Sequence, residues 1–269
     1  VCFPRKMQRF RKVFPKRGCS IIGMIHVGGL PGTPRYSGSC EKLIDEAVRD
    51  AEIYRDAGVD GVLVENMHDI PYVQAKDLQP ETTAMMSRIC SEVRKIVPRH
   101  VPCGVQVLAG GNRHAIAIAQ AAGFQFIRAE GFVFSHVADE GFTDACAGTL
   151  LRYRRQIGAD DVLVFADVKK KHSAHAITSD VGLSETAKAA EFFLADGVIL
   201  TGTATGCPKL QLLGPVIVGS GVETLNLQKY ARAHALIVGT HFKVDGKWEN
   251  SVDAAAVDNF MKHLSRLSS

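Results

Sequence analysis

Long apolar runs, paired cysteines and a nucleotide-binding glycine motif are all missing from this sequence. No run reaches 18 apolar residues, which excludes a helix long enough to span a membrane. The seven cysteines are odd in number and form no Cys-x-x-Cys pair, so we expect a reduced intracellular protein without structural disulfides or a zinc ribbon. With 46% hydrophobic and 22% charged residues, the 269-residue chain is neither disordered nor fibrous.

Acidic residues are also missing from the first 40 positions, which carry eight Lys and Arg residues. Of the 32 basic residues, 24 therefore remain beside 28 acidic residues in the rest of the chain, a net charge of −4 there. A basic arm can bind nucleic acid or an anionic membrane, and an arginine-rich, acid-free start is also typical of a mitochondrial presequence. We favour a solvated tail and no nucleic-acid partner. Residues 1–17 are predicted to be a disordered arm and residues 18–269 a single domain, in the cytoplasm or the mitochondrion.

Eight short, β-branched apolar runs alternate with amphipathic stretches. The predicted strands are residues 21–26, 61–64, 104–108, 125–128, 162–167, 197–201, 215–219 and 236–239. The predicted helices are residues 40–57, 82–97, 112–122, 149–157, 183–194, 225–233 and 252–267. Continuous apolar runs are typical of parallel strands covered on both faces. Eight such units in about 250 residues predict an α/β fold of the (β/α)8 barrel type. An open doubly wound sheet is the alternative, but no Gly-x-Gly-x-x-Gly motif follows the first strand.

The sixth crossover is unusually short. Only 13 residues separate Thr201 from Pro215, and the first seven of them are a glycine-rich loop. A crossover that includes a helix needs at least about 10–12 residues. We therefore predict that the sixth helix is truncated to one turn or is absent.

Ionisable residues follow most of the predicted strands, where the active site of a barrel lies. We predict catalytic roles for four of them: Glu65 and Asp167 would move protons, and Lys169 and His172 would supply a cation or a nucleophile. A lysine at this position can form a Schiff base, whereas we expect Lys170 to lie in solvent. Further predicted mouth residues are His26, Asn66, Asp69, Gln106, Arg128, Glu130 and Lys171.

Glycine-rich turns follow the sixth, seventh and eighth strands. Backbone N–H groups at such turns can approach an anion closely, because glycine has no Cβ. The predicted phosphate-binding residues are Gly202, Thr205, Gly219, Ser220, Gly221, Gly239 and Thr240, which makes a small phosphorylated molecule the expected ligand. The carboxylates at the strand ends could hold a divalent metal together with His26 or His68, but no spacing is diagnostic. We predict no metal and no other cofactor.

Six motifs, in order along the chain, resemble the BtpA/SgcQ family. They are Ile-Gly-Met-Ile-His (22–26) followed by Leu-Pro-Gly-Thr-Pro (30–34), Val-Glu-Asn-Met-His-Asp (64–69), Asp-Val-Lys-Lys-Lys-His (167–172), Thr-Gly-Thr-Ala-Thr-Gly (201–206), Val-Gly-Ser-Gly-Val (218–222) and Val-Gly-Thr-His-Phe-Lys (238–243). The resemblance covers about residues 19–264 and implies a TIM barrel with an anion site at its mouth. The family is named for a cyanobacterial factor needed for photosystem I accumulation, and other members lie near genes of sugar or nucleoside metabolism. Its members normally carry a full sixth crossover helix, of which roughly a dozen residues are missing here.

Two function classes follow. The first is an enzyme that acts on a sugar or nucleoside phosphate by acid/base or Schiff-base chemistry, as an isomerase or lyase does. The second is a non-catalytic assembly or binding factor that retains the anion site; either is compatible with a homo-oligomer. The charged residues expected at the mouth favour the enzyme, because a scaffold has no need to bury charge.

Overall fold

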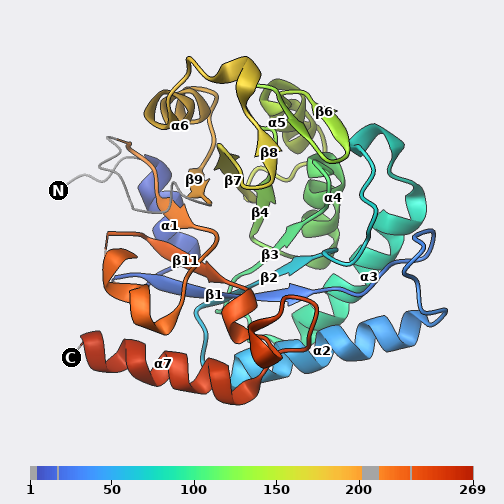
Figure 1. Ribbon diagram of the computed structural model, residues 1–269, viewed down its shortest axis with the longest axis vertical. Helices are drawn as coiled ribbons and strands as arrows, with labels where there is room; N and C mark the ends of the chain where they lie inside the picture. The colour runs from blue at the N-terminus through green and yellow to red at the C-terminus, as the bar shows by residue number, and fades with distance from the viewer. Residues whose placement is uncertain (1–4, 17, 202–211, 231, 269) are drawn as a thin grey trace.

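Eight parallel strands close into a barrel in the computed structural model, which describes residues 5–16, 18–201, 212–230 and 232–268. The strands are β1 (Ser20–His26), β2 (Gly61–Glu65), β3 (Cys103–Gln106), β4 (Phe126–Ala129), β7 (Leu163–Val168), β9 (Gly197–Leu200), β10 (Val216–Val218) and β11 (Ala235–Val238). Strand β1 pairs with both β2 and β11, which closes the ring (Figure 1). The predicted barrel is confirmed, and every predicted strand lies within two residues of an observed one.

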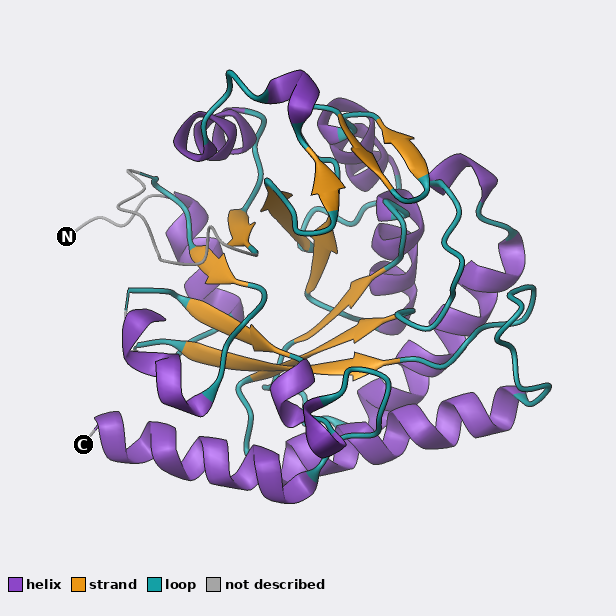
Figure 2. Cartoon of the chain, in the orientation of Figure 1, coloured by secondary structure: helices purple, strands orange, loops and turns teal. Residues whose placement is uncertain are grey.

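Helices cover the outside of the barrel (Figure 2). They are α2 (Cys40–Asp56), α3 (Pro80–Ile96), α4 (Asn112–Ala122), α5 (Ala147–Gln156), α6 (Leu183–Phe192) and α7 (Ala254–Ser268), with short 3-10 turns η1 (Ala75–Asp77), η2 (Ala176–Thr178), η5 (Thr240–Phe242) and η6 (Val244–Gly246). The predicted helix at 225–233 is instead a 3-10 helix, η4 (Thr224–Tyr230). Each covering helix buries one apolar face against the outward side of the strands, and this outer core is the larger of two hydrophobic clusters.

The inside of the barrel is a second, separate hydrophobic cluster. Alternate residues of each strand point inward, and they stack in layers. The inward residues include Ile22, Met24, Leu63, Phe126, Leu163, Phe165, Ile199, Ile217, Ala235 and Ile237. Because the side-chain period of a strand is two, the next inward position at each C-terminal strand end belongs to the mouth of the barrel.

The N-terminal arm differs from its prediction. Residues 5–13 form helix α1 (Arg5–Val13), and Phe10 and Phe14 are fully buried within the inner cluster at the bottom of the barrel. Phe14 packs on Phe126 with ring centroids 5.6 Å apart. The prediction of a disordered arm was wrong because Met7, Phe10 and Phe14 share one helical face, a pattern that the surrounding basic residues conceal.

The basic residues of the arm are also held by the barrel. Arg9 forms an ion pair with Asp196, a carboxylate that also binds Arg154 at 2.8 Å. Lys16 lies 2.9 Å from Asp60. These pairs tie residues 5–16 to loops at the N-terminal ends of the strands, so this described part of the arm is packed on the barrel.

A small antiparallel sheet stands above the mouth and was not predicted. Its strands are β5 (His136–Ala138), β6 (Gly141–Thr143) and β8 (Ser173–Ala174), in the order β6-β5-β8. It joins the loop after β4 to the loop after β7. Its strands are two or three residues long, too short to leave a periodic signal in the sequence.

The sixth crossover falls largely outside the described residues, because residues 202–211 are not among them. Residues 212–215, which lead into β10, form no helix. None of the helices in the described ranges is long and apolar enough to cross a membrane, and the five cysteines there are all free.

Candidate active site at the mouth of the barrel

The top inward layer of the barrel is polar. Its eight positions, one from each strand or its end, are His26, Glu65, Gln106, Arg128, Asp167, Thr201, Gly219 and Gly239. Six carry polar side chains, and the two on neighbouring strands β10 and β11 are glycines. Above this layer lies a cavity of about 650 Å³, which is within the size range of small-molecule sites.

Gly239 leaves room on one side of the cavity, whereas Gly219 allows close packing against β9. A Cβ at Gly219 would lie 2.5 Å from Cγ2 of Ile199, and one at Gly239 would lie 3.5–3.6 Å from Met24 and His26. Ser220, Gly221 and Thr240 line the same side. The structure therefore brings together the predicted phosphate-binding residues of β10 and β11, whereas Gly202 and Thr205 lie outside the described residues.

Glu65 belongs to the polar layer below the cavity and lines it. Its side chain is buried, and burial is the main cause that raises its pKa to about 7. The carboxylates of Glu130 and Asp167 raise this pKa further, while the Arg128 guanidinium lowers it. A carboxyl group with such a pKa can both give and take a proton near neutral pH.

His26 lies beside Glu65, with Nε2 3.8 Å from the carboxylate. Burial, and then the charge of Lys243, lowers the pKa of His26 to about 3, so the ring is neutral at pH 7. Its Nδ1 lies 3.2 Å from the carbonyl oxygen of Trp248. Because a carbonyl only accepts, Nδ1 must carry the proton, which leaves Nε2 as an acceptor facing Glu65.

Arg128 and Asp167 form a buried ion pair. The guanidinium Nε donates to both carboxylate oxygens of Asp167 at 3.1 Å. Burial raises the pKa of Asp167, and the charge of Arg128 opposes that rise. Arg128 lines the main cavity, whereas Asp167 lines the neighbouring small pocket, so Asp167 holds Arg128 in place while Arg128 faces the main cavity.

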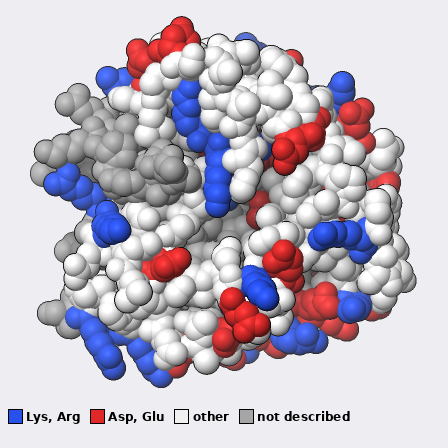
Figure 3. All heavy atoms as spheres, in the orientation of Figure 1, with Lys and Arg blue, Asp and Glu red and all other residues white. Residues whose placement is uncertain are grey.

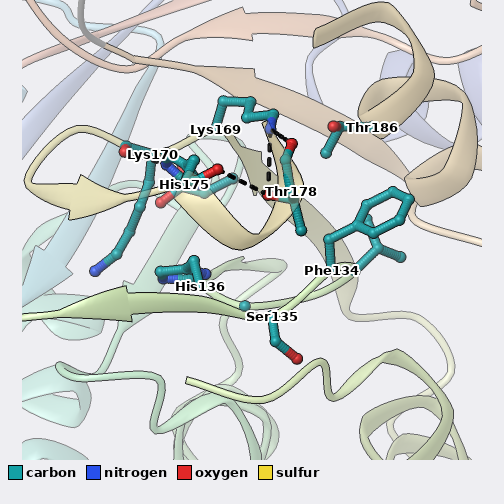
Figure 4. A pocket seen from close by; sticks show the side chains of 11 residues that line it. Phe134, Ser135, His136, Lys169, Lys170, His175, Thr178 and Thr186 are labelled. Atoms are coloured by element: carbon teal, nitrogen blue, oxygen red, sulfur yellow. Dashed lines mark hydrogen bonds between the residues drawn. The ribbon is translucent and has the colours of Figure 1, made fainter. Parts of the chain in front are cut away.

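The lysines after β7 are placed differently from the prediction. Lys169 adopts a φ of +48°, which ends the extended backbone, and its Nζ donates to the Thr178 carbonyl at 2.8 Å in a small side pocket. Figure 4 shows Lys169 and Lys170 pointing in different directions. Lys170, expected in solvent, lies in the wall of the main cavity with a side chain that is only 12% exposed and with its Nζ 2.9 Å from Glu130.

The charges around Lys170 keep it protonated. Burial alone lowers the pKa of Lys170, but Glu130 at 2.9 Å and Glu140 at 3.9 Å outweigh that effect and raise it. Glu130 is fixed in turn by the backbone N–H of Gly110 at 2.8 Å. The alternation of side chains along a strand predicts that Lys169 points into the barrel mouth. The positive φ of Lys169 breaks this alternation, so that Lys170 lines the cavity instead.

The remaining predicted mouth residues divide between the rim and the scaffold. Lys171 and His172 are exposed at the rim of the cavity. Asn66 and Asp69 shape a loop instead: Asn66 accepts the Leu108 N–H at 2.7 Å, and Asp69 accepts the Leu30 N–H at 2.8 Å.

Several cavity residues escaped the sequence analysis. They are Tyr72, Asp139, Glu140, Lys170, Thr201 and Trp248. Thr201 could have been predicted, because it lies two residues after Ile199 and therefore on the same, inward side of the strand. Asp139 and Glu140 form the turn of the β5–β6 hairpin, and the strands of this hairpin are too short to be predicted from the sequence pattern.

Charge of both signs surrounds the cavity. Figure 3 shows a hollow near the centre of the viewed face, with Lys and Arg atoms on one rim and Asp and Glu atoms close by. Within the described ranges, no three His, Cys, Asp or Glu side chains are arranged so that they could hold a metal ion. Two of the carboxylates are instead engaged in ion pairs, Asp167 with Arg128 and Glu130 with Lys170.

Comparison with known proteins begins with the sequence. A family model described as "BtpA family" matches residues 17–266. An uncharacterized mitochondrial protein of Caenorhabditis elegans is 46% identical, with 92% of this chain and 93% of that protein covered. The photosystem I biogenesis protein BtpA of Synechocystis is 32% identical, with 91% of this chain and 88% of that protein covered.

Solved structures share the barrel at low sequence identity. N-(5'-phosphoribosyl)anthranilate isomerase from Pyrococcus furiosus is 13% identical with a TM-score of 0.55, covering 92% of this chain and 99% of the other. OMP decarboxylase from Leishmania donovani is 13% identical with a TM-score of 0.57, covering 97% of each chain. At this level the similarity is one of fold.

Proposed function

The chain belongs to the BtpA family, and from that premise we propose that it is an enzyme that moves protons within a small phosphorylated metabolite. The reaction class is isomerisation or a related lyase step. Glu65 is the acid and base, Arg128 stabilises negative charge that develops on the substrate, and the turns after β10 and β11 hold the phosphate.

The observation that carries this proposal is the buried Glu65 facing a polar cavity. Its pKa of about 7 matches the requirement of proton transfer at neutral pH. Such a group destabilises the fold whenever it ionises, and a purely structural role gives no reason to accept that cost. Arg128, fixed by Asp167, supplies a preorganised positive charge beside it.

The phosphate subsite rests on the turns that follow β10 and β11. The missing side chain of Gly239 leaves space beside Met24 and His26, and Ser220 and Thr240, whose N–H groups and hydroxyls can bind an anion, line the same side of the cavity. The P. furiosus neighbour, which shares this fold, is named as an isomerase of a phosphoribosyl compound. That name sets the class of ligand to test first.

Acid/base chemistry is favoured here over a Schiff base. Lys169 faces the side pocket and binds the Thr178 carbonyl, away from the main cavity. Lys170 faces the cavity but is held as a cation between two carboxylates. Schiff-base formation requires a neutral amine that reaches the substrate. Lys169 points away from the main cavity and Lys170 is held as a cation, so neither lysine suits it as placed.

A binding role is the second candidate. The Synechocystis relative is named as a photosystem I biogenesis protein, and in this chain Phe192, Phe193 and Leu194 at the end of α6 are exposed. Exposed neighbouring apolar side chains of this kind often mark a protein contact. A binding factor would use this flank and show no turnover at the mouth.

The first test measures anion binding. Phosphate and D-ribose 5-phosphate should raise the melting temperature of the wild type by mass action, because the free energy of unfolding increases by about 2.7 kcal/mol at 100 times Kd. Gly239→Val should abolish the response because it fills the space beside His26. Gly182→Val, at an exposed position with an ordinary φ of −71°, is the matched control and should respond like the wild type.

The second test measures proton transfer. A panel of sugar phosphates in D₂O, followed by NMR, should show enzyme-dependent exchange of a carbon-bound proton for deuterium in at least one compound. Glu65→Gln should abolish the exchange and keep the phosphate-induced rise in melting temperature. Exchange that persists in Glu65→Gln would reject its role, and phosphate without effect on the wild type would reject the anion site.

A further inference from the structure

Gln106 has a buried acceptor that nothing in the described part of the chain satisfies. The residue ends β3, is 1% exposed and lines the mouth cavity. Its Oε1 is buried and makes no hydrogen bond to any described residue. Buried polar atoms are nearly always paired, so an acceptor left open at a cavity wall indicates a group supplied from the cavity.

The surroundings of Gln106 define what that group can be. Glu65 pairs with it in the β2–β3 register, and Arg128 lies on the next strand, β4. The Nε of Arg128 already donates a hydrogen bond to the carboxylate of Asp167. A positively charged donor would be repelled by Arg128, which leaves a neutral donor such as a hydroxyl.

The position in the ring adds a second constraint. In the strand order β1-β11-β10-β9-β7-β4-β3-β2, strand β3 is four places from β10 in either direction. Gln106 and the Gly219 turn therefore lie on opposite sides of the mouth. One ligand can reach both only if a chain of atoms joins its phosphate to its hydroxyl.

We propose that Gln106 is a specificity-determining residue whose Oε1 accepts a hydrogen bond from a hydroxyl at the end of the substrate remote from its phosphate. This inference rests on the proposed function, because it takes the anion site at β10 and β11 as the other anchor. The substrate class is then a phosphate monoester of a polyhydroxylated carbon chain, that is, a sugar or polyol phosphate.

Two probes that differ in hydroxyl groups test this by isothermal titration calorimetry. The wild type should bind D-ribose 5-phosphate about tenfold more tightly than n-butyl phosphate, the size of one well-formed hydrogen bond. In Gln106→Met, which keeps the length but removes the acceptor, this preference should fall to near unity. The affinity for n-butyl phosphate should not fall, since the variant leaves the phosphate side intact.

Two further variants control for folding and for the amide itself. Gln106→Glu restores an acceptor and should recover a preference of several-fold. Gln120→Met makes the same substitution on the exposed face of α4 and should keep the wild-type preference. A melting curve for each variant establishes that it is folded.

The outcomes separate this inference from the proposed function. Binding of both phosphate esters with equal affinity by the wild type, or a preference that survives in a folded Gln106→Met, overturns the role of Gln106 alone. If neither ester nor inorganic phosphate binds the wild type, the anion site is overturned, and the inference falls with it.

Discussion

Replacing Glu65 by Gln should make the protein more stable at alkaline pH. The carboxyl group is buried at the floor of the cavity and holds its proton until about pH 7, whereas the unfolded chain loses it near 4.5. Glutamine has the same shape as the protonated acid and cannot ionise. The pH dependence of the difference between the two proteins therefore isolates the cost of ionising Glu65.

The sign and size follow from linkage. Below pH 4.5 the group is protonated in both states, and the wild type carries no penalty. Between 4.5 and about 7 the folded protein binds the extra proton, so its stability relative to Glu65→Gln falls as the pH rises. Above 7 the full deficit is present, about 3 kcal/mol at 1.36 kcal/mol per pH unit.

Urea denaturation from pH 4 to pH 8.5 measures this difference. For a chain of this size, about 3 kcal/mol corresponds to roughly 6–12 °C in melting temperature. Glu52→Gln on the outer helix α2 is the control for loss of a carboxyl group elsewhere. A difference between wild type and Glu65→Gln that stays constant with pH, or that favours the wild type at pH 8, would refute the reasoning.

Two further predictions concern the bottom and the wall of the barrel. Phe10→Ala should lower the free energy of unfolding by about 3–5 kcal/mol, because it leaves a cavity inside the barrel. A loss below about 1 kcal/mol in a denaturant titration would show that α1 does not close the bottom of the barrel. Lys170→Met should cost about 3–5 kcal/mol, because it leaves Glu130 buried without its cation. The double variant Lys170→Met/Glu130→Gln should recover most of that loss, and failure to recover would mean that Lys170 stabilises the loop by packing rather than by charge.

The position of the site could be predicted from the sequence because it depends on local order. Eight apolar runs with helical stretches between them leave a barrel as the compact arrangement, and a barrel fixes which strand ends meet. Strand parity then assigns His26, Glu65, Gln106 and Arg128 to one layer, since the side-chain period of two continues to the strand end. The glycines of β10 and β11 could be identified in the same way.

The roles within that layer depended on contacts between residues far apart in the chain. The pKa of Glu65 is set by burial and by charges on β4, on β7 and in the loops that follow them, and no local pattern encodes them. The choice between Lys169 and Lys170 depends on one backbone angle, φ +48°, stabilised by a bond to Thr178. Phe10 and Phe14 can be buried only once the barrel has formed, because Phe10 packs on Phe165 of β7 and Phe14 packs on Phe126 of β4. Periodicity specifies which face of an element is apolar, but which partner covers that face, and what charge it brings, is decided when the barrel closes.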